Sequence, residues 1–89
     1  MREHEAARAA AEARGAEIRE RLKTLTSREN EVFALVVTGM LNKQIASVLG
    51  VGEKTVKVHR ARVLEKMRAG SVAELVLLAD SVGVSVPKS

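Results

Sequence analysis

Helix start and stop signals follow one another closely between residues 26 and 82. The sequences Thr-Ser-Arg-Glu at 26–29 and Ser-Val-Ala-Glu at 71–74 have the spacing of a capping box. In a capping box, each of the two outer side chains accepts a hydrogen bond from the other residue's backbone N–H. Gly39 and Gly50 follow short apolar stretches, and glycine readily ends a helix. These signals predict four short helices: one from the cap at Thr26 to Gly39, and then 42–49, 53–67 and 71–81, with a break at 69–70.

The apolar content of the chain is almost entirely aliphatic. Phe33 is the only aromatic residue among 89, and such a core suits packed helices better than a sheet. We therefore expect an all-α fold with one domain at 25–82, a helix at 1–24 that is rich in Ala, Arg and Glu, and a flexible tail at 83–89.

The predicted N-terminal helix has a weak apolar seam. Its members recur at spacings of four and three, at Ala11, Gly15, Ile18, Leu22 and Leu25. The seam could pack on the domain or pair with a second copy as a short coiled coil, but Ala and Gly supply little knob volume for a coiled coil. We expect residues 18–25 to dock locally and residues 1–12 to fray.

The net charge of +4 lies in one segment. Residues 53–68 carry six basic and two acidic side chains, and the rest of the chain is balanced. The chain has no cysteine, no signal peptide and no apolar run near the ~20 residues that span a bilayer, so we expect a cytoplasmic protein without membrane contact. His4 and His59 are the only histidines and lie far apart in the sequence. We therefore expect no metal site, no cofactor and no enzymatic activity.

Residues 42–59 meet the requirements of a helix-turn-helix unit. Ala46 is small enough for the point where two helices cross, and Gly50 tolerates the positive φ of the turn. Val51, Val56 and Val63 supply the inner apolar side. In DNA-binding proteins of this type the second helix enters the major groove, which suits the cationic helix at 53–67. A helical hairpin in any small bundle is the alternative.

Several stretches carry a resemblance to the LuxR/NarL/FixJ-type DNA-binding domain. They are Leu-Thr-Ser-Arg-Glu-Asn-Glu-Val at 25–32, Asn-Lys-Gln-Ile-Ala at 42–46, Leu-Gly-Val at 49–51, Lys-Thr-Val-Lys-Val-His-Arg-Ala-Arg at 54–62, Lys-Met at 66–67 and Glu-Leu-Val at 74–76. The resemblance is strongest to the FixJ-like branch. It implies a four-helix domain that regulates transcription, binds inverted-repeat promoter DNA as a homodimer, and forms the C-terminal effector domain of a two-component response regulator. It also implies an upstream receiver domain, if the chain is a fragment, and RNA polymerase as a further partner.

Two positions depart from the family pattern. Gly52 stands where the family usually has Ser, so the helix at 53–67 lacks a side-chain cap. Leu41 stands where Ser or Thr often caps the preceding helix, so we expect Asn42 to cap instead.

Helical periodicity divides the helix at 53–67 into two faces. Val56, Val63 and Met67, with the stem of Arg60, point toward the other helices. The outward face provides the predicted base contacts, with Lys57 as the leading reader of guanine: Lys54, Lys57, Val58, Ala61 and Arg62. The predicted phosphate contacts, of which Thr55 and His59 rest on the resemblance, are Asn42, Lys43, Thr55, His59 and Lys66. Exposed residues of the last helix are the predicted dimer interface: Leu77, Leu78 and Ser81.

Two rival functions share some of these features. A sigma-factor promoter-reading domain has a similar Arg-Glu-rich opening, but it commonly ends with its recognition helix, whereas this chain has a further capped helix at 71–81. A protein-interaction module would use the first and last helices and leave the basic helix incidental. A steep salt dependence of DNA binding would separate DNA recognition from that module.

Overall fold

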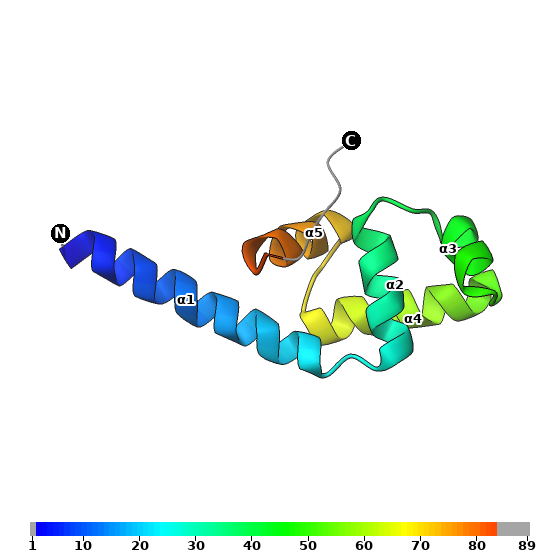
Figure 1. Ribbon diagram of the computed structural model, residues 1–89, viewed down its shortest axis with the longest axis horizontal. Helices are drawn as coiled ribbons and strands as arrows, with labels where there is room; N and C mark the ends of the chain where they lie inside the picture. The colour runs from blue at the N-terminus through cyan, green and yellow to red at the C-terminus, as the bar shows by residue number, and fades with distance from the viewer. Residues whose placement is uncertain (1, 84–89) are drawn as a thin grey trace.

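The structure, a computed structural model, describes residues 2–83, with side chains from residue 5 onward. Within that range the chain is helical and has no strand. The five helices are α1 (Arg2–Lys23), α2 (Ser27–Val37), α3 (Asn42–Leu49), α4 (Glu53–Met67) and α5 (Val72–Ser81) (Figure 1). None of them is both long and apolar enough to cross a bilayer. The predicted all-α fold and the order of its helices are confirmed. Apart from Gly83, the predicted tail lies outside the described residues.

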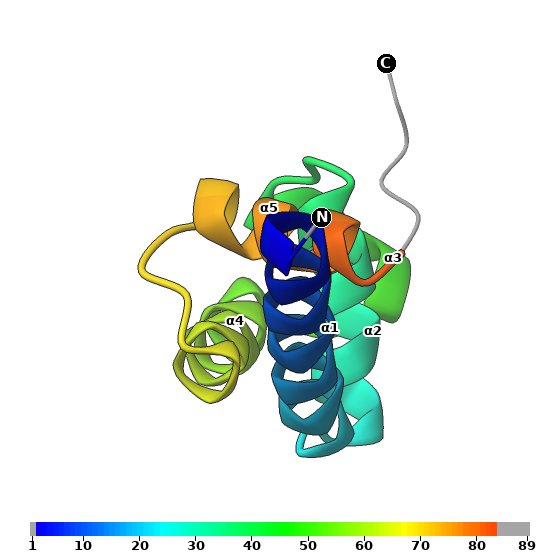
Figure 2. The ribbon, with the colours of Figure 1, turned by 90° about the vertical axis from the view of Figure 1, so that its left-hand side faces the viewer.

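The core lies where α2, α4 and α5 meet. α2 packs mainly on α4, α3 packs on α4 at one end of the molecule, and α5 covers α2 on the side away from that end (Figures 1 and 2). The largest fully buried side chains are aliphatic: Val32, Ile45, Val56, Val63, Met67 and Leu75. Phe33 joins them and is nearly as deeply buried. Helix packing of this kind leaves the outer faces of α3 and α4 open to solvent.

The predicted helix start at Thr26 forms in full. The Thr26 hydroxyl accepts from the Glu29 N–H at 3.1 Å, and the Thr26 N–H donates to Glu29 Oε1 at 2.9 Å. At α5 only half of the predicted box forms. The Ser71 hydroxyl accepts from the Glu74 N–H at 3.1 Å, but the Glu74 carboxylate accepts from the N–H of Gly70 instead.

One predicted helix cap is wrong. Leu41, not Asn42, is the N-cap of α3, and Gln44 Oε1 accepts the Leu41 N–H at 2.9 Å. Asn42 is the first helical residue, so its side chain is free to bond elsewhere. α4 ends at Met67, as predicted, and the chain turns at Arg68, with φ of 54°, just before the predicted break at 69–70.

Gly50 ends α3 with φ of 68°, a left-handed conformation that other residues adopt at a cost of about 1–2 kcal/mol. We expect Gly50→Ser to lower the thermal midpoint by roughly 4–16 °C. Gly52→Ser is the matched control: Gly52 has φ of −77° and space around an added Cβ, and the hydroxyl would cap α4. Thermal unfolding followed by circular dichroism compares the two. Equal midpoints would show that the turn does not depend on the glycine.

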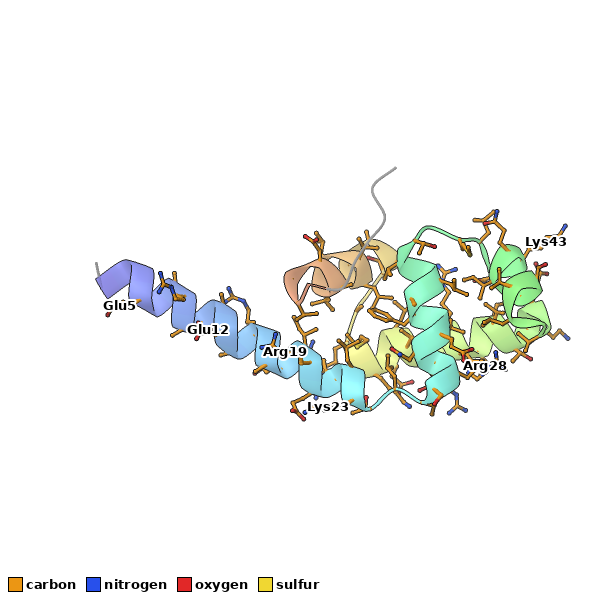
Figure 3. All side chains as sticks on the ribbon, viewed as in Figure 1. Glu5, Glu12, Arg19, Lys23, Arg28 and Lys43 are labelled. Carbon is orange, nitrogen blue, oxygen red and sulfur yellow. The ribbon has the colours of Figure 1, made fainter. Side chains whose placement is uncertain are left out.

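α1 is one continuous helix that leads into the domain. Its C-terminal half docks as predicted: Ile18 is buried, and Leu22 and Leu25 pack against the core. Side chains from residue 5 to residue 14 are exposed, and Glu5 and Glu12 project from the helix far from the rest of the fold (Figure 3). Fraying of residues 1–12 stays a prediction.

Two hydrogen bonds tie the end of α1 to the end of α4. Arg21 Nη1 donates to the Met67 carbonyl at 3.2 Å, and Lys66 Nζ donates to the Thr24 carbonyl at 3.0 Å. Cations stabilise the C-terminal end of a helix because its carbonyl groups carry partial negative charge. The linker helix and α4 are therefore held together at one end of the domain.

Candidate nucleic-acid interface

The packing of α3 on α4 determines which side chains of α4 face solvent. Ile45 and Ala46 are buried on α3, and Val56, Val63 and Met67 are buried on α4. Ala46 lies at the crossing, where a larger side chain would force the helices apart. The predicted inner face of α4 is confirmed, and it fixes the opposite face toward solvent.

The outer face of α4 is cationic from Lys54 to Arg62, and the exposed Glu65 follows one helical turn later. The predicted base-contact residues are all exposed there: Lys54, Lys57, Val58, Ala61 and Arg62. Among the described residues, no ion pair joins Lys54, Lys57 or Arg62 to an acidic group. These three cations are therefore available to an anionic partner. Val58 is 52% exposed, so an apolar side chain lies within the same cationic face.

The start of α3 adds a second positive region beside this face. Lys43 is exposed and extends away from α3 into solvent (Figure 3). The first N–H groups of a helix have no partner inside it, and they attract anions such as phosphate. Lys43 and the start of α3 can therefore bind the same anionic group.

Asn42 has a structural partner that the sequence did not reveal. Its Oδ1 accepts a hydrogen bond from Arg60 Nη1 at 3.1 Å, which joins α3 to α4. Both side chains are half-buried. This bond leaves the Asn42 amide N–H groups free to donate to a ligand. No local pattern could have identified the pair, because eighteen positions separate the two residues.

The cap of α3 was also missed, although a signal for it exists. Leu41 and Gln44 have the three-residue spacing of a capping box, and Gln is one of the two residues that fill its last position. The Gln44 side chain can accept the Leu41 N–H although Leu41 has no hydroxyl group of its own.

Thr55 and His59 lie one helical turn apart on the same side of α4. Thr55 is exposed and His59 is half-buried. His59 Nδ1 is buried and has no hydrogen-bond partner among the described residues. Nε2 is therefore the ring nitrogen that can reach a ligand, and a neutral ring with its proton on Nε2 could donate to a phosphate oxygen.

Lys66 lies apart from the other predicted phosphate contacts. Its ammonium is 2.6 Å from Glu29 Oε1, and the Glu29 side chain is only 3% exposed. The hydrogen bonds from Lys66 and from the Thr26 N–H hold the pKa of Glu29 below its ordinary value of 4.5, although burial acts to raise it. The charge of Lys66 is therefore compensated inside the fold. A buried carboxylate needs such a partner, which gives Lys66 a structural role.

The predicted dimer residues lie on α5 beside α1. Leu77 is 69% exposed, as expected for an interface residue. The expectation that Leu78 is also exposed is wrong, because Leu78 is half-buried and packs against the core. Ser81 is exposed, and its hydroxyl donates to the Leu78 carbonyl at 2.7 Å. Only Leu77 therefore offers a large apolar side chain to a partner at this position.

Comparisons with known proteins place this geometry in a family context. The family model described as bacterial regulatory proteins of the luxR family matches residues 23–79. The transcriptional regulatory protein FixJ of Rhizobium meliloti is 48% identical over 67 residues, which cover 75% of this chain and 33% of that protein. Nodulation protein W of Bradyrhizobium diazoefficiens is 44% identical over 70 residues, covering 79% of this chain and 31% of that protein.

Solved structures agree with the sequence matches. Full-length FixJ from B. japonicum superposes with a TM-score of 0.79 at 38% identity, over 86% of this chain and 38% of that one. The response regulator StyR superposes with a TM-score of 0.78 at 40% identity, over 84% of this chain and 38% of that one. The chain spans about a third of the length of these relatives.

Proposed function

This chain belongs to the LuxR family of bacterial regulatory proteins, and on that basis we propose that it recognises specific promoter sequences in double-stranded DNA. α4 lies in the major groove, where its outer face reads base edges. The observation that carries the proposal is the face of α4 on which Lys54, Lys57 and Arg62 are exposed and form no ion pair with any described residue.

The residues of this face have distinct roles in the proposal. Lys57 donates to the O6 or N7 of guanine, and Val58 contacts a thymine methyl group. Ala61 allows close approach of the helix to the bases. Lys54 and Arg62 contact base edges or the neighbouring phosphates. Backbone phosphates are held by residues beside the face, on α3 and on one side of α4: Asn42, Lys43, Thr55 and His59.

A salt series tests DNA recognition directly. The affinity of the 89-residue chain for a duplex obtained by selection from random sequences is measured by fluorescence anisotropy at increasing salt. With Lys43, Lys54 and Arg62 at DNA phosphates, log affinity should fall with log salt at a slope of about −2 to −3 per chain. Lys23→Ala, which removes a cation from α1, should leave the slope unchanged. A flat salt response without sequence preference would favour the protein-interaction module instead.

The length of the relatives supports a place for this domain in a larger regulator. The chain corresponds to about a third of each relative, and one of them, StyR, is described as a response regulator. We propose that a receiver domain precedes α1 in the intact protein and that α1 joins the two parts. Contact with RNA polymerase stays a prediction.

The same proposal includes a homodimer on inverted half-sites, formed through α5 at Leu77, Leu78 and Ser81. One apolar side chain as exposed as Leu77 gives a weak dimer, so pairing is completed on DNA. We expect Leu77→Lys to abolish cooperative binding to a duplex with two half-sites. Leu77 is chosen alone because Leu78 packs against the core.

The control for that variant is its affinity for a duplex with a single half-site, which should equal that of the unaltered chain. Electrophoretic mobility shifts on the two duplexes separate cooperativity from intrinsic affinity. If Leu77→Lys retains full cooperativity, the dimer does not form through α5.

A further inference from the structure

We propose that a groove between α1 and α5 receives Leu77 of a second copy of the chain, so that the linker helix supplies half of the dimer contact. This inference rests on the homodimer of the proposed function. It assigns a binding role to α1, which is otherwise only a connection.

The groove has a volume of about 280 Å³ and is mostly apolar. Ala11, Gly15 and Ile18 line it from α1, and Leu77 and Leu78 line it from α5. The end of α5 lies over the middle of α1 (Figures 1 and 2). Ala11 helps to keep the groove open because its side chain is too short to fill it, whereas Gly15 is buried beside the Arg19 side chain. The space suits one aliphatic side chain.

The patch is complementary to itself, as a two-fold interface requires. In such an interface the same surface is used by both copies, so it must hold both a protruding group and the hollow that accepts it. Leu77 protrudes at the rim of the groove and is 69% exposed. A two-fold rotation can place each Leu77 over the groove of the other copy.

Charged side chains at the rim of the groove also favour a second copy of the chain as its partner. Arg14 lines the groove on α1, and Asp80 follows Leu77 by three positions on α5, which places it on a neighbouring part of the same helix surface. Both side chains are exposed, and neither takes part in an ion pair within the described part of the chain. The same rotation brings Arg14 of one copy toward Asp80 of the other, twice per dimer.

The exposure of α1 fits this arrangement. The helix spans 22 residues, but its side chains from residue 5 to residue 14 contact no other element closely enough to be buried. Isolated helices shorter than about 12–15 residues are marginal in water, and the exposed stretch from residue 5 to residue 14 is of that size. A second copy on the face of Ala11 and Arg14 would supply the missing packing.

Charge reversal tests the pairing between copies. Arg14→Asp gives a homodimer with two facing pairs of acids, and Asp80→Arg gives one with two facing pairs of bases. Each variant alone should self-associate roughly tenfold more weakly than the unaltered chain in sedimentation equilibrium. An equimolar mixture of the two variants should recover the original association, because both pairs in the mixed dimer are of opposite charge. If Arg14 and Asp80 contacted each other within one chain, mixing the two variants would not restore self-association.

A second pair of variants tests the groove itself. Ala11→Glu places a charge in the groove, and Ala13→Glu makes the same change on the opposite face of α1, where it is the control. Both positions are exposed, so both variants should keep the thermal midpoint of the unaltered chain. Only Ala11→Glu should weaken self-association and cooperative binding to two half-sites.

The outcomes separate this inference from the proposed function. Leu77→Lys could abolish cooperative binding while the other three variants retain it: Ala11→Glu, Arg14→Asp and Asp80→Arg. That result would support a dimer through α5 and overturn the role of α1. A mixture of the two charge variants that associates as weakly as each alone would also overturn it. A chain that binds single half-sites but stays monomeric at every concentration would reject the groove while leaving DNA recognition intact.

Discussion

Replacing Glu29 by Ala is expected to lower the free energy of unfolding by about 2–3 kcal/mol, and the thermal midpoint by roughly 10–20 °C. Glu29 accepts hydrogen bonds from the Thr26 N–H and from Lys66, and Lys66 in turn donates to the Thr24 carbonyl. The substitution removes half of the capping box and the partner of a partly buried ammonium. The effect stays below that of a fully buried pair because the Lys66 side chain, 32% exposed, can turn to water.

Glu31→Ala is the matched control. Glu31 lies on the same helix and pairs with Arg28 at 3.0 Å, but both side chains are well exposed, so the loss should stay within about 0.5 kcal/mol. Chemical denaturation with urea gives both free energies. Glu29→Gln should fall between the two, because its amide oxygen still accepts the Thr26 N–H. If Glu29→Ala and Glu31→Ala were equally mild, the pair with Lys66 would contribute nothing to the fold.

The same carboxylate gives the domain an acid-sensitive component of stability. The pKa of Glu29 is below 4.5 in the folded chain, because Lys66 and the Thr26 N–H favour the charged form. As the pH falls, the Glu29 carboxylate is protonated in the unfolded chain before it is protonated in the folded chain. The stabilisation of the fold by ionised Glu29 is therefore complete above pH 4.5, and it is lost as the pH falls through the lowered pKa of the folded chain. Urea denaturation at several pH values should therefore show that the difference in free energy of unfolding between the original chain and Glu29→Gln becomes smaller only in that acidic range.

The helices were predictable because their signals are local. A capping box at Thr26, a left-handed glycine at Gly50 and a period of 3.6 residues are all read within a few positions. The cap of α3 was predicted at Asn42 instead of Leu41, although the spacing of Leu41 and Gln44 is itself a local signal. Two features had no local signal: the hydrogen bond from Arg60 to Asn42, which joins two helices, and the left-handed turn at Arg68, which is not a glycine.

In the candidate interface, too, local periodicity predicts some positions, whereas contacts with distant residues determine others. Exposure along α4 follows from periodicity, so the outward position of Lys57 and Val58 was predictable. The position of Lys66 was not, because its ammonium contacts Glu29, thirty-seven residues earlier in the chain. The burial of Leu78 was likewise decided by packing against the core, which the sequence of α5 alone does not show.

Lys57→Ala is expected to have the largest effect on recognition, costing about 1–3 kcal/mol of affinity for the selected site. Lys57 lies in the middle of the outer face of α4 and is exposed, so its loss should not change the thermal midpoint. Because its ammonium is proposed to bond a guanine edge, the preference at one position of each half-site should relax. Binding-site selection with the variant measures that preference.

Lys43→Ala provides the matched comparison, since it removes the same charge from the start of α3. A phosphate contact carries no sequence information, so this variant should weaken binding to all sequences about equally and make the salt slope shallower by about 0.9. Both variants lose one cation from exposed positions, and only the kind of DNA group contacted differs. A relaxed preference in Lys43→Ala, with preference intact in Lys57→Ala, would move base recognition from the centre of α4 to the start of α3.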